Sequence, residues 1–244
     1  MENCFFHDLY KTVREVQVRE CAAKSLSHLL HGYLSVYSMV RICPELEKEY
    51  GTLGEIHGRS RDVVIELSKL ITDKSVELDE RIGYVADMME AYQVYEDMNF
   101  LDQALNEAYN ILPEEGGKVV LPKKTPNLCR LLCDSYYFTN DDYYLSLARE
   151  VVEAWENEEE QGEEKDLERI LAVELYGNMI DLDMFVEGNN YYLIRENLEQ
   201  EALRVLINKD MCLMAWCFVI LAMQKYRQIE FQEQERSFRM YASC

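Results

Sequence analysis

Turn-forming residues and basic residues are scarce in this sequence. Only 4 Pro and 10 Gly occur among the 244 residues, which is about half the usual share of each. An all-β fold needs many tight turns, so this scarcity disfavours one. The 25 Lys and Arg residues are outnumbered by 46 Asp and Glu residues, giving a formal net charge of −21. This charge repels phosphate groups, so we expect neither nucleic acid nor an anionic membrane as a partner.

The sequence also lacks a long apolar run and a leader-like start. One segment, 211–223, is apolar without a break, but a bilayer span needs roughly 20 residues. The first eight residues contain no basic stretch and no long apolar stretch, so a secretory signal is not expected. The eight cysteines therefore favour free thiols in a reducing compartment over a disulfide scaffold. We predict a cytoplasmic protein in which Cys129, Cys212 and Cys217 are small core residues.

Apolar residues recur at helical spacing through most of the chain. The pattern over 13–42 stops before Pro44, where a helix must end, and three glycines within 51–58 predict a turn region. The fold class predicted is all-α, built as stacked antiparallel helical hairpins in an α/α superhelix of about 8–9 helices. We expect one domain over 1–244, with the best-defined hairpins in 78–208 and a terminal helix over 209–240.

A short pattern of Asp or Asn followed by aromatic residues occurs three times. Residues 97–104 resemble 141–148, and 140–145 resemble 188–193. The shift between neighbouring copies is roughly 44 to 48 residues, within the range of helical-hairpin repeats. Asn and Asp tolerate turn geometry and accept hydrogen bonds from the first N–H groups of the next helix. Each copy therefore predicts the tight turn of a helical hairpin.

Two known architectures resemble these hairpins. Small and aromatic residues stand roughly where tetratricopeptide-like repeats place theirs, namely Tyr92, Tyr95, Ala104, Ala108 and Pro113, although the spacing exceeds roughly 34 residues. The stretch 140–150 is similar to the hairpin turns of α/α-toroid enzymes, such as the unsaturated glucuronyl hydrolases and the N-acylglucosamine epimerases. Those toroids contain more hairpins than this chain has room for. No catalytic motif of either group carries over by position.

Candidate ligand-facing residues lie in one inter-hairpin link and in the repeated turns. The link 112–127 carries basic residues that are unusual in so acidic a chain, and loops often carry function. Aromatic side chains near the turns could line a groove for a sugar or a peptide. The candidates are Lys118, Lys123, Lys124, Asn127, Tyr136, Tyr137, Asp141, Tyr144 and Tyr192. The simpler interpretation is a solvated connector followed by aromatic packing within hairpins.

Other residue patterns carry weaker chemical signals. His28 and His31 share a helix face with Cys21 nearby, but a metal site needs three or four convergent ligands. We therefore expect ordinary surface or interfacial histidines, and no metal or cofactor. Cys129 and Cys133 do not have CxxC spacing, so they are expected in the core. No serine-nucleophile, zinc-protease or phosphate-loop signature occurs.

The function predicted is a non-catalytic helical-repeat module that binds a protein or peptide, for which a basic partner would suit the charge. The alternative is a small α/α-fold enzyme or binding protein that acts on carbohydrate, which requires converging carboxylates and aromatics. The apolar segment 211–223 is predicted to lie fully inside the structure. A homodimer through this helix is the second way to cover it.

Overall fold

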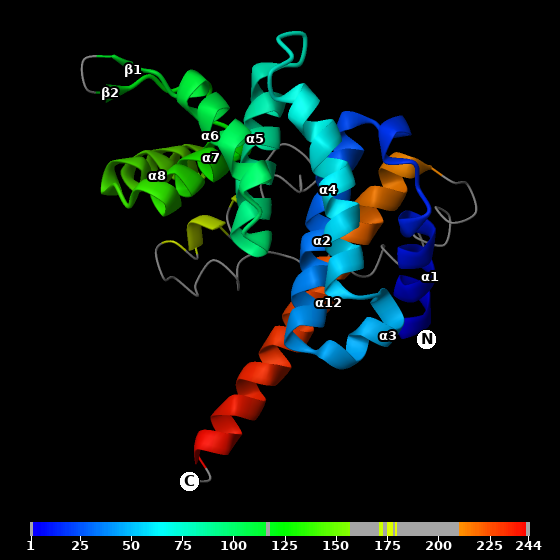
Figure 1. Ribbon diagram of the computed structural model, residues 1–244. Coiled ribbons are helices and arrows are strands. Elements are labelled where there is room, and N and C mark those ends of the chain that lie inside the picture. Colours follow the sequence, from blue (N-terminus) through cyan, green and yellow to red (C-terminus); the bar gives the residue numbers. More distant parts are fainter. Residues whose placement is uncertain are drawn as a thin grey trace. The chain divides into compact units, whose positions relative to one another are not determined.

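The fold is all-α, as the sequence predicts. A computed structural model describes residues 2–115, 118–156, 171–172, 175–177, 179 and 210–242. These residues form nine α-helices, two short 3-10 helices and one pair of two-residue strands (Figure 1). The chain divides into two compact units, which are described separately. We call 1–67 with 195–244 the terminal unit, and 68–194 the central unit. The single domain expected from the sequence remains a prediction.

None of the described helices is both long and apolar enough to cross a membrane. The terminal unit is built around the pairing of α2 with α12. Gly32 of α2 makes this pairing close, because a Cβ atom there would lie 2.3 Å from the ring of Phe218 in α12. Pro44 ends α2 as predicted, although the helical pattern over 13–42 is divided between α1, a 3-10 turn and α2. The helices are α1 Glu2–Arg14, η1 Val18–Glu20, α2 Ala23–Ile42, η2 Pro44–Leu46, α3 Glu47–Tyr50, α4 Leu53–Leu70 and α12 Met211–Ala242.

Aromatic rings fill the interior of the terminal unit. The ring of Phe218 lies 5.4 Å from Tyr33, 5.9 Å from Tyr10 and 6.2 Å from Phe6 between centroids. Tyr10 donates its hydroxyl proton to the carbonyl oxygen of Tyr50 at 2.8 Å, so this buried polar group is satisfied. Because these rings come from α1, α2, α3 and α12, one cluster joins segments far apart in sequence.

The turn predicted over 51–58 is wrong for most of that stretch. Helix α4 begins at Leu53 and contains both Gly54 and Gly58. The backbone N–H of Thr52 donates to Glu55 Oε2 at 2.8 Å, and the N–H of Glu55 donates to Thr52 Oγ1 at 3.3 Å. This reciprocal capping box satisfies N–H groups that have no partner at a helix start, which offsets the poor helix propensity of glycine.

The apolar segment 211–223 is only partly buried, so the prediction of full burial is wrong. Phe218 and its neighbours through Ile220 are buried, but Trp216 is half-buried and Cys212 is exposed. Cys212 is therefore not the core residue predicted, whereas Cys217 is. The first turn of this segment is open to solvent on one side, while most residues of its later turns are buried. A second copy of the chain over the open side remains a prediction.

The central unit contains two antiparallel hairpins whose first helices pack together. Arg81 of α5 forms an ion pair with Glu107 of α6, which supports the first hairpin. The two short strands pair antiparallel, with Glu114 opposite Val119. The elements are α5 Leu78–Tyr95, α6 Met98–Ile111, β1 Glu114–Glu115, β2 Lys118–Val119, α7 Pro126–Thr139 and α8 Asp142–Glu156.

The turns of the two hairpins have the same local structure, at the spacing the sequence predicts. Glu96 and Asn140 both adopt left-handed backbone, with φ of 56° and 53°. Asp97 accepts a hydrogen bond from the N–H two residues later at 3.1 Å, and Asp141 does the same at 3.0 Å. These side chains cap α6 and α8 in the same way. The third copy, around 188–193, lies outside the described residues.

Candidate functional site

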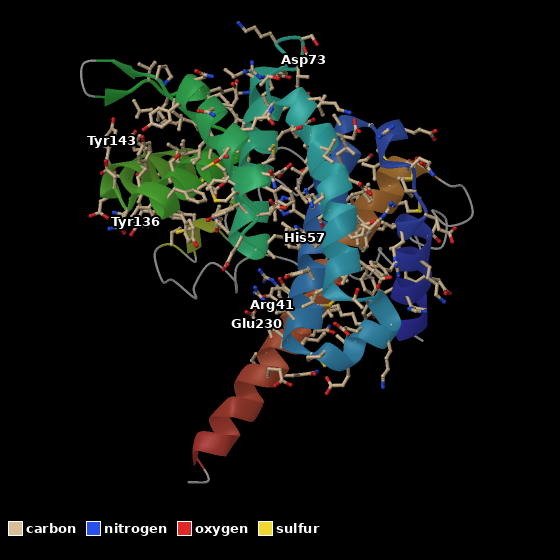
Figure 2. The ribbon with its side chains drawn as sticks, in the orientation of Figure 1. Arg41, His57, Asp73, Tyr136, Tyr143 and Glu230 are labelled. Atoms are coloured by element: carbon tan, nitrogen blue, oxygen red, sulfur yellow. The ribbon has the colours of Figure 1, made fainter. Side chains whose placement is uncertain are left out.

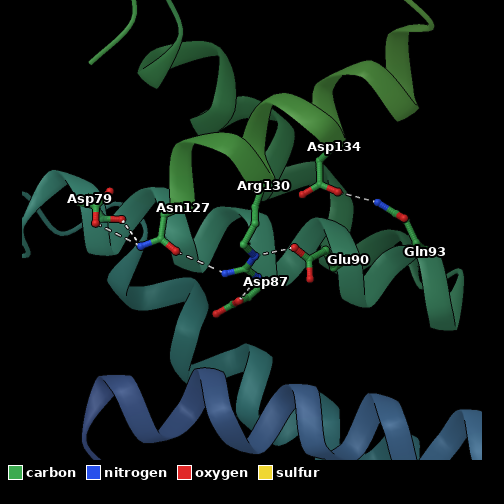
Figure 3. Close-up of polar contacts among 7 residues, drawn as sticks. All are labelled: Asp79, Asp87, Glu90, Gln93, Asn127, Arg130 and Asp134. Carbon is green, nitrogen blue, oxygen red and sulfur yellow. Dashed lines mark hydrogen bonds and ion pairs between the residues drawn. The ribbon is translucent and has the colours of Figure 1, made fainter. Parts of the chain in front are cut away.

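A cluster of buried charges joins α5 to α7 in the central unit (Figure 3). Arg130 of α7 is only 1% exposed. Its guanidinium donates to Asp87 Oδ1 at 2.5 Å and to Glu90 Oε1 at 2.8 Å, both on α5. The two carboxylates raise the pKa of Arg130 despite burial, so the guanidinium stays charged. Removing one partner of such a buried ion pair is strongly destabilising, because it leaves an unpaired charge inside the protein.

Asp134 extends the cluster by one helical turn. It is fully buried, and its Oδ1 accepts from Gln93 Nε2 at 2.7 Å. No described residue forms a hydrogen bond with its Oδ2. Burial is the largest cause that raises the pKa of Asp134 well above its usual range; Glu90 and Asp87 raise it further, while Arg130 and the Gln93 bond oppose the shift. Burial and the neighbouring carboxylates therefore favour the neutral form of Asp134.

The other end of the cluster is fixed by an amide. Asn127 donates from Nδ2 to the backbone oxygen of Asp79 at 3.2 Å, and its Oδ1 accepts from Arg130 at 3.5 Å. Gly83 allows this approach, because a Cβ there would lie 2.9 Å from the Asn127 amide. Thr125, the residue that caps α7, donates its hydroxyl proton to Asp79. Asn127, predicted to face a ligand, is thus buried and bonded within the protein.

The contacts run in order along both helices, which shows that α5 and α7 are parallel. Asp79 meets the start of α7, Asp87 meets its middle, and Gln93 meets Asp134 near its end. Figure 3 shows the same order across the three groups. Because each hairpin turns at the end of one of these helices, both turns lie at the same end of the central unit. We call the exposed residues there the turn-end surface: Glu96, Met98, Tyr137, Asp141 and Asp142.

The turn-end surface exposes large apolar side chains above a ring-packed base. Tyr137 and Met98 are each 52% exposed. The ring of Phe138 lies 5.1 Å from Tyr137 and 5.7 Å from Tyr92, so aromatic contacts run from α7 to α5 beneath the surface. The packed base holds Tyr137 in place, and a pre-ordered aromatic side chain loses little entropy on binding.

The same surface carries negative charge, and the helices that form it contain few basic residues. The sequence between Arg81 and Lys118 contains no Lys or Arg. From 125 to 148 the only basic residue is Arg130, which is buried. Along α8 the first exposed basic residue is Arg149, about two turns after Asp142. Such a surface attracts a positively charged segment.

The basic link lies along α8 and reaches the first turn of that helix. Lys124 contacts Glu150, with Nζ 3.7 Å from Oε2. The Val119 N–H donates to the hydroxyl of Tyr143 at 3.2 Å. Lys123 is exposed, and Lys118 lies in β2. Lys124 thus lies beside the middle of α8, whereas the strand that contains Lys118 reaches the first turn of α8, next to Asp142.

The remaining predicted residues are placed on one hairpin. Tyr136 and Tyr144 are half-buried, and Asp141 is an exposed helix cap. Figure 2 labels Tyr136 and Tyr143 on this α7–α8 hairpin. Tyr192 lies outside the described residues. The structure therefore places Tyr137 and Asp141 at the same end of the central unit as two residues that were not predicted, Glu96 and Met98.

The histidines and cysteines correct one expectation and confirm another. His28 and His31 are buried in α2, not at the surface. Cys129 and Cys133 are fully buried, as predicted. Within the part of the chain that the structure describes, no three His, Cys, Asp or Glu side chains converge on a potential metal position.

A second cluster that the sequence did not reveal lies in the terminal unit. Lys225 of α12 places its ammonium 4.9 Å from the ring of Tyr50 and 5.2 Å from that of Phe6, within cation–π range. It also forms a hydrogen bond with the Tyr50 hydroxyl. Burial lowers the pKa of Lys225 and Glu49 opposes this shift. The signal for Arg130 was present in the sequence, as a single basic residue within an apolar helix. No comparable pattern marks Lys225.

Function cannot be transferred from relatives in this case. Comparison of the chain with protein-family models, with curated proteins and with solved structures finds no match.

Proposed function

We propose that the central unit is a non-catalytic helical-repeat module that binds a basic protein or peptide segment in the cytoplasm through its turn-end surface. The observation that carries the proposal is the combination of exposed Tyr137 and Met98 with exposed acids in two stretches, 82–117 and 125–148, whose sole Lys or Arg is the buried Arg130. Apolar anchors supply most binding energy in protein interfaces, and charges around them select the partner.

The two halves of the turn-end surface have separate roles in this proposal. Tyr137 offers a rigid aromatic face, onto which an apolar or arginine side chain can stack. Asp141 and Asp142 would attract the basic residues of the partner and set the rate of association. Since exposed charges are screened by salt, binding should weaken as ionic strength rises.

The interior cluster also fits a binding module better than the carbohydrate enzyme considered from the sequence. A glycosidase needs two carboxylates across a cleft that admits substrate. Asp87 and Glu90 do converge, but both hold Arg130, and Asp87 is fully buried. This arrangement favours a structural role for these carboxylates.

The proposal is tested with short fluorescent peptides that contain aromatic residues and carry Arg, Ser or Glu at the other positions. We expect binding of the Arg peptides by the full chain, measured by anisotropy, and weaker or no binding of the Glu peptides. Tyr137→Ala should reduce affinity about fivefold or more, as truncation of a central aromatic anchor does. Asp142→Asn should chiefly reduce the dependence of binding on salt.

Tyr109 provides a matched control, because it is 80% exposed on α6 and lies toward the opposite end of that helix. Tyr109→Ala should leave affinity unchanged. Equal losses from the two tyrosine variants, or equal binding of the Glu and Arg peptides, would contradict the proposal. Helical content measured by circular dichroism confirms that each variant is folded.

A further inference from the structure

Three carboxyl groups in the central unit surround one cation. Arg130 bonds directly to Asp87 and Glu90, and Asp134 lies on the same helix as Arg130, one turn later. Asp87 and Asp134 are both fully buried. If all three were ionised, the cluster would carry two uncompensated negative charges in a low-dielectric interior, which is strongly unfavourable.

Asp134 is the member of the cluster best placed to carry a proton. Asp87 and Glu90 each accept a charge-assisted bond from Arg130, which stabilises their ionised forms. Asp134 receives only the neutral amide of Gln93, and that bond uses Oδ1. Its second oxygen, Oδ2, is free of hydrogen bonds from the described residues and can hold a proton.

The surroundings of Asp134 contain no further cation among the described residues. Helix α5 presents Asp87, Glu90 and Gln93. Helix α7 itself contributes Arg130 and the thiol of Cys133, whose pKa is raised by its contact with Cys129 and by burial. Helix α8, which also packs on α7, buries the apolar residues Leu147, Ala148, Val151 and Val152.

We propose that the Arg130 cluster is a pH-sensitive device that joins α5 to α7. Asp134 keeps its proton in the folded protein at neutral pH, and loss of that proton weakens the pairing of the two helices. The device is independent of the proposed peptide binding, because it concerns the interior of the central unit and needs no ligand.

The direction of the pH dependence follows from linkage. The carboxyl of Asp134 holds its proton more tightly when folded than when unfolded, since burial raises its pKa only in the folded state. Its contribution to stability is therefore complete below the unfolded value of about 3.9 and is lost as pH rises toward the folded value. Over that window the unfolding equilibrium constant should increase by at most about tenfold per pH unit from this group.

Infrared spectroscopy of the full chain tests the protonation directly. With aspartate isotopically labelled at its side-chain carboxyl, the folded protein at neutral pH should show the carbonyl band of a protonated acid. Asp134→Asn should remove this band, whereas Asp102→Asn, at an exposed position on α6, should leave it. Absence of the band at neutral pH, or its persistence in the Asp134 variant, would overturn the proposal.

Denaturant unfolding tests the consequence for stability. Asn resembles a protonated Asp, so the stability of Asp134→Asn relative to the wild type should rise from pH 5 to pH 9, while that of Asp102→Asn should not. A constant difference over this range means that the protonation of Asp134 does not change on unfolding, which refutes the device. If Asp134→Asn does not fold, Glu90→Gln replaces it. Because the Glu90 carboxylate raises the pKa of Asp134, removing it should shift the loss of the acid band to lower pH. An unchanged titration of the band in Glu90→Gln would then refute the coupling.

Discussion

The two units of this protein solve the same packing problem with different chemistry. The terminal unit fills its interior with aromatic rings, and its buried hydroxyls donate to backbone oxygens, as Tyr10 does to Tyr50. The central unit places Arg130 between Asp87 and Glu90 at the contact of its two parallel helices. One interior depends on shape and the other on charge pairing.

This difference predicts which substitutions and which changes of pH each unit should tolerate. Burial of apolar rings depends little on pH, but it is sensitive to added volume because interiors are close-packed. Buried ion pairs tolerate no loss of a partner and respond to protonation. Substitutions can therefore be chosen that weaken one unit and spare the other.

The largest effect is expected for Arg130→Met. The substitution leaves Asp87 and Glu90 buried without their cation, which should cost about 3–5 kcal/mol of unfolding free energy. Hydrogen exchange followed by mass spectrometry should show faster exchange in peptides from α5 and α7 than in the wild type. Peptides from α2 should be affected less. As a control, Arg19→Met should change little, because Arg19 is 89% exposed and its pair with Glu66 is a surface pair. Equal effects of the two variants would break the comparison.

A smaller effect, in the terminal unit, is expected for Gly32→Ala. The new methyl group would overlap the ring of Phe218, which neighbouring rings hold in place. Overpacking of this kind typically costs about 1–3 kcal/mol. Trp216 fluorescence during denaturation, measured with Trp155→Phe in the background, reports on this unit.

Gly58→Ala is the matched control for that substitution. Gly58 also lies within a helix of the terminal unit, but a Cβ there meets nothing within 4 Å. Alanine should therefore stabilise α4 by about 0.5–1 kcal/mol through helix propensity. The comparison fails if both glycine variants shift the unfolding midpoint in the same direction.

The smallest effect is expected at the two matched turns, which belong to neither interior. Glu96 and Asn140 both have positive φ, a conformation that Asn tolerates better than Glu. Glu96→Gly should raise stability by up to about 1 kcal/mol, and Asn140→Gly should raise it less. Calorimetric melting temperatures would measure both. A larger gain at Asn140 would show that contacts of the side chains, and not backbone strain, control these turns.

The helical class and the two matched turns could be predicted because their causes are local. Asp97 and Asp141 cap helices through bonds to residues two positions later, and such bonds need no tertiary partner. The prediction for 51–58 was wrong because glycine alone was counted, while Thr52 and Glu55 form a capping box across the same residues. The basic link was grouped with the aromatic turns because both flank α7. In the structure Lys124 lies beside Glu150, away from the turns, while Val119 reaches Tyr143 next to the second turn.

The sequence by itself determined the elements of this protein. Helical periodicity, the stop at Pro44 and the caps at Asp97 and Asp141 all depend on residues that are close together in the sequence. They can therefore be predicted from the sequence alone. The tertiary structure alone decided what those elements bury. That Asp87 and Glu90 meet Arg130, that Gly32 admits Phe218, and that Lys225 lies over Tyr50 are contacts between residues at least 40 positions apart. Such contacts depend on how the helices pack. A sequence pattern predicts that a charged residue is exposed, because the pattern does not show the partner that allows the residue to be buried.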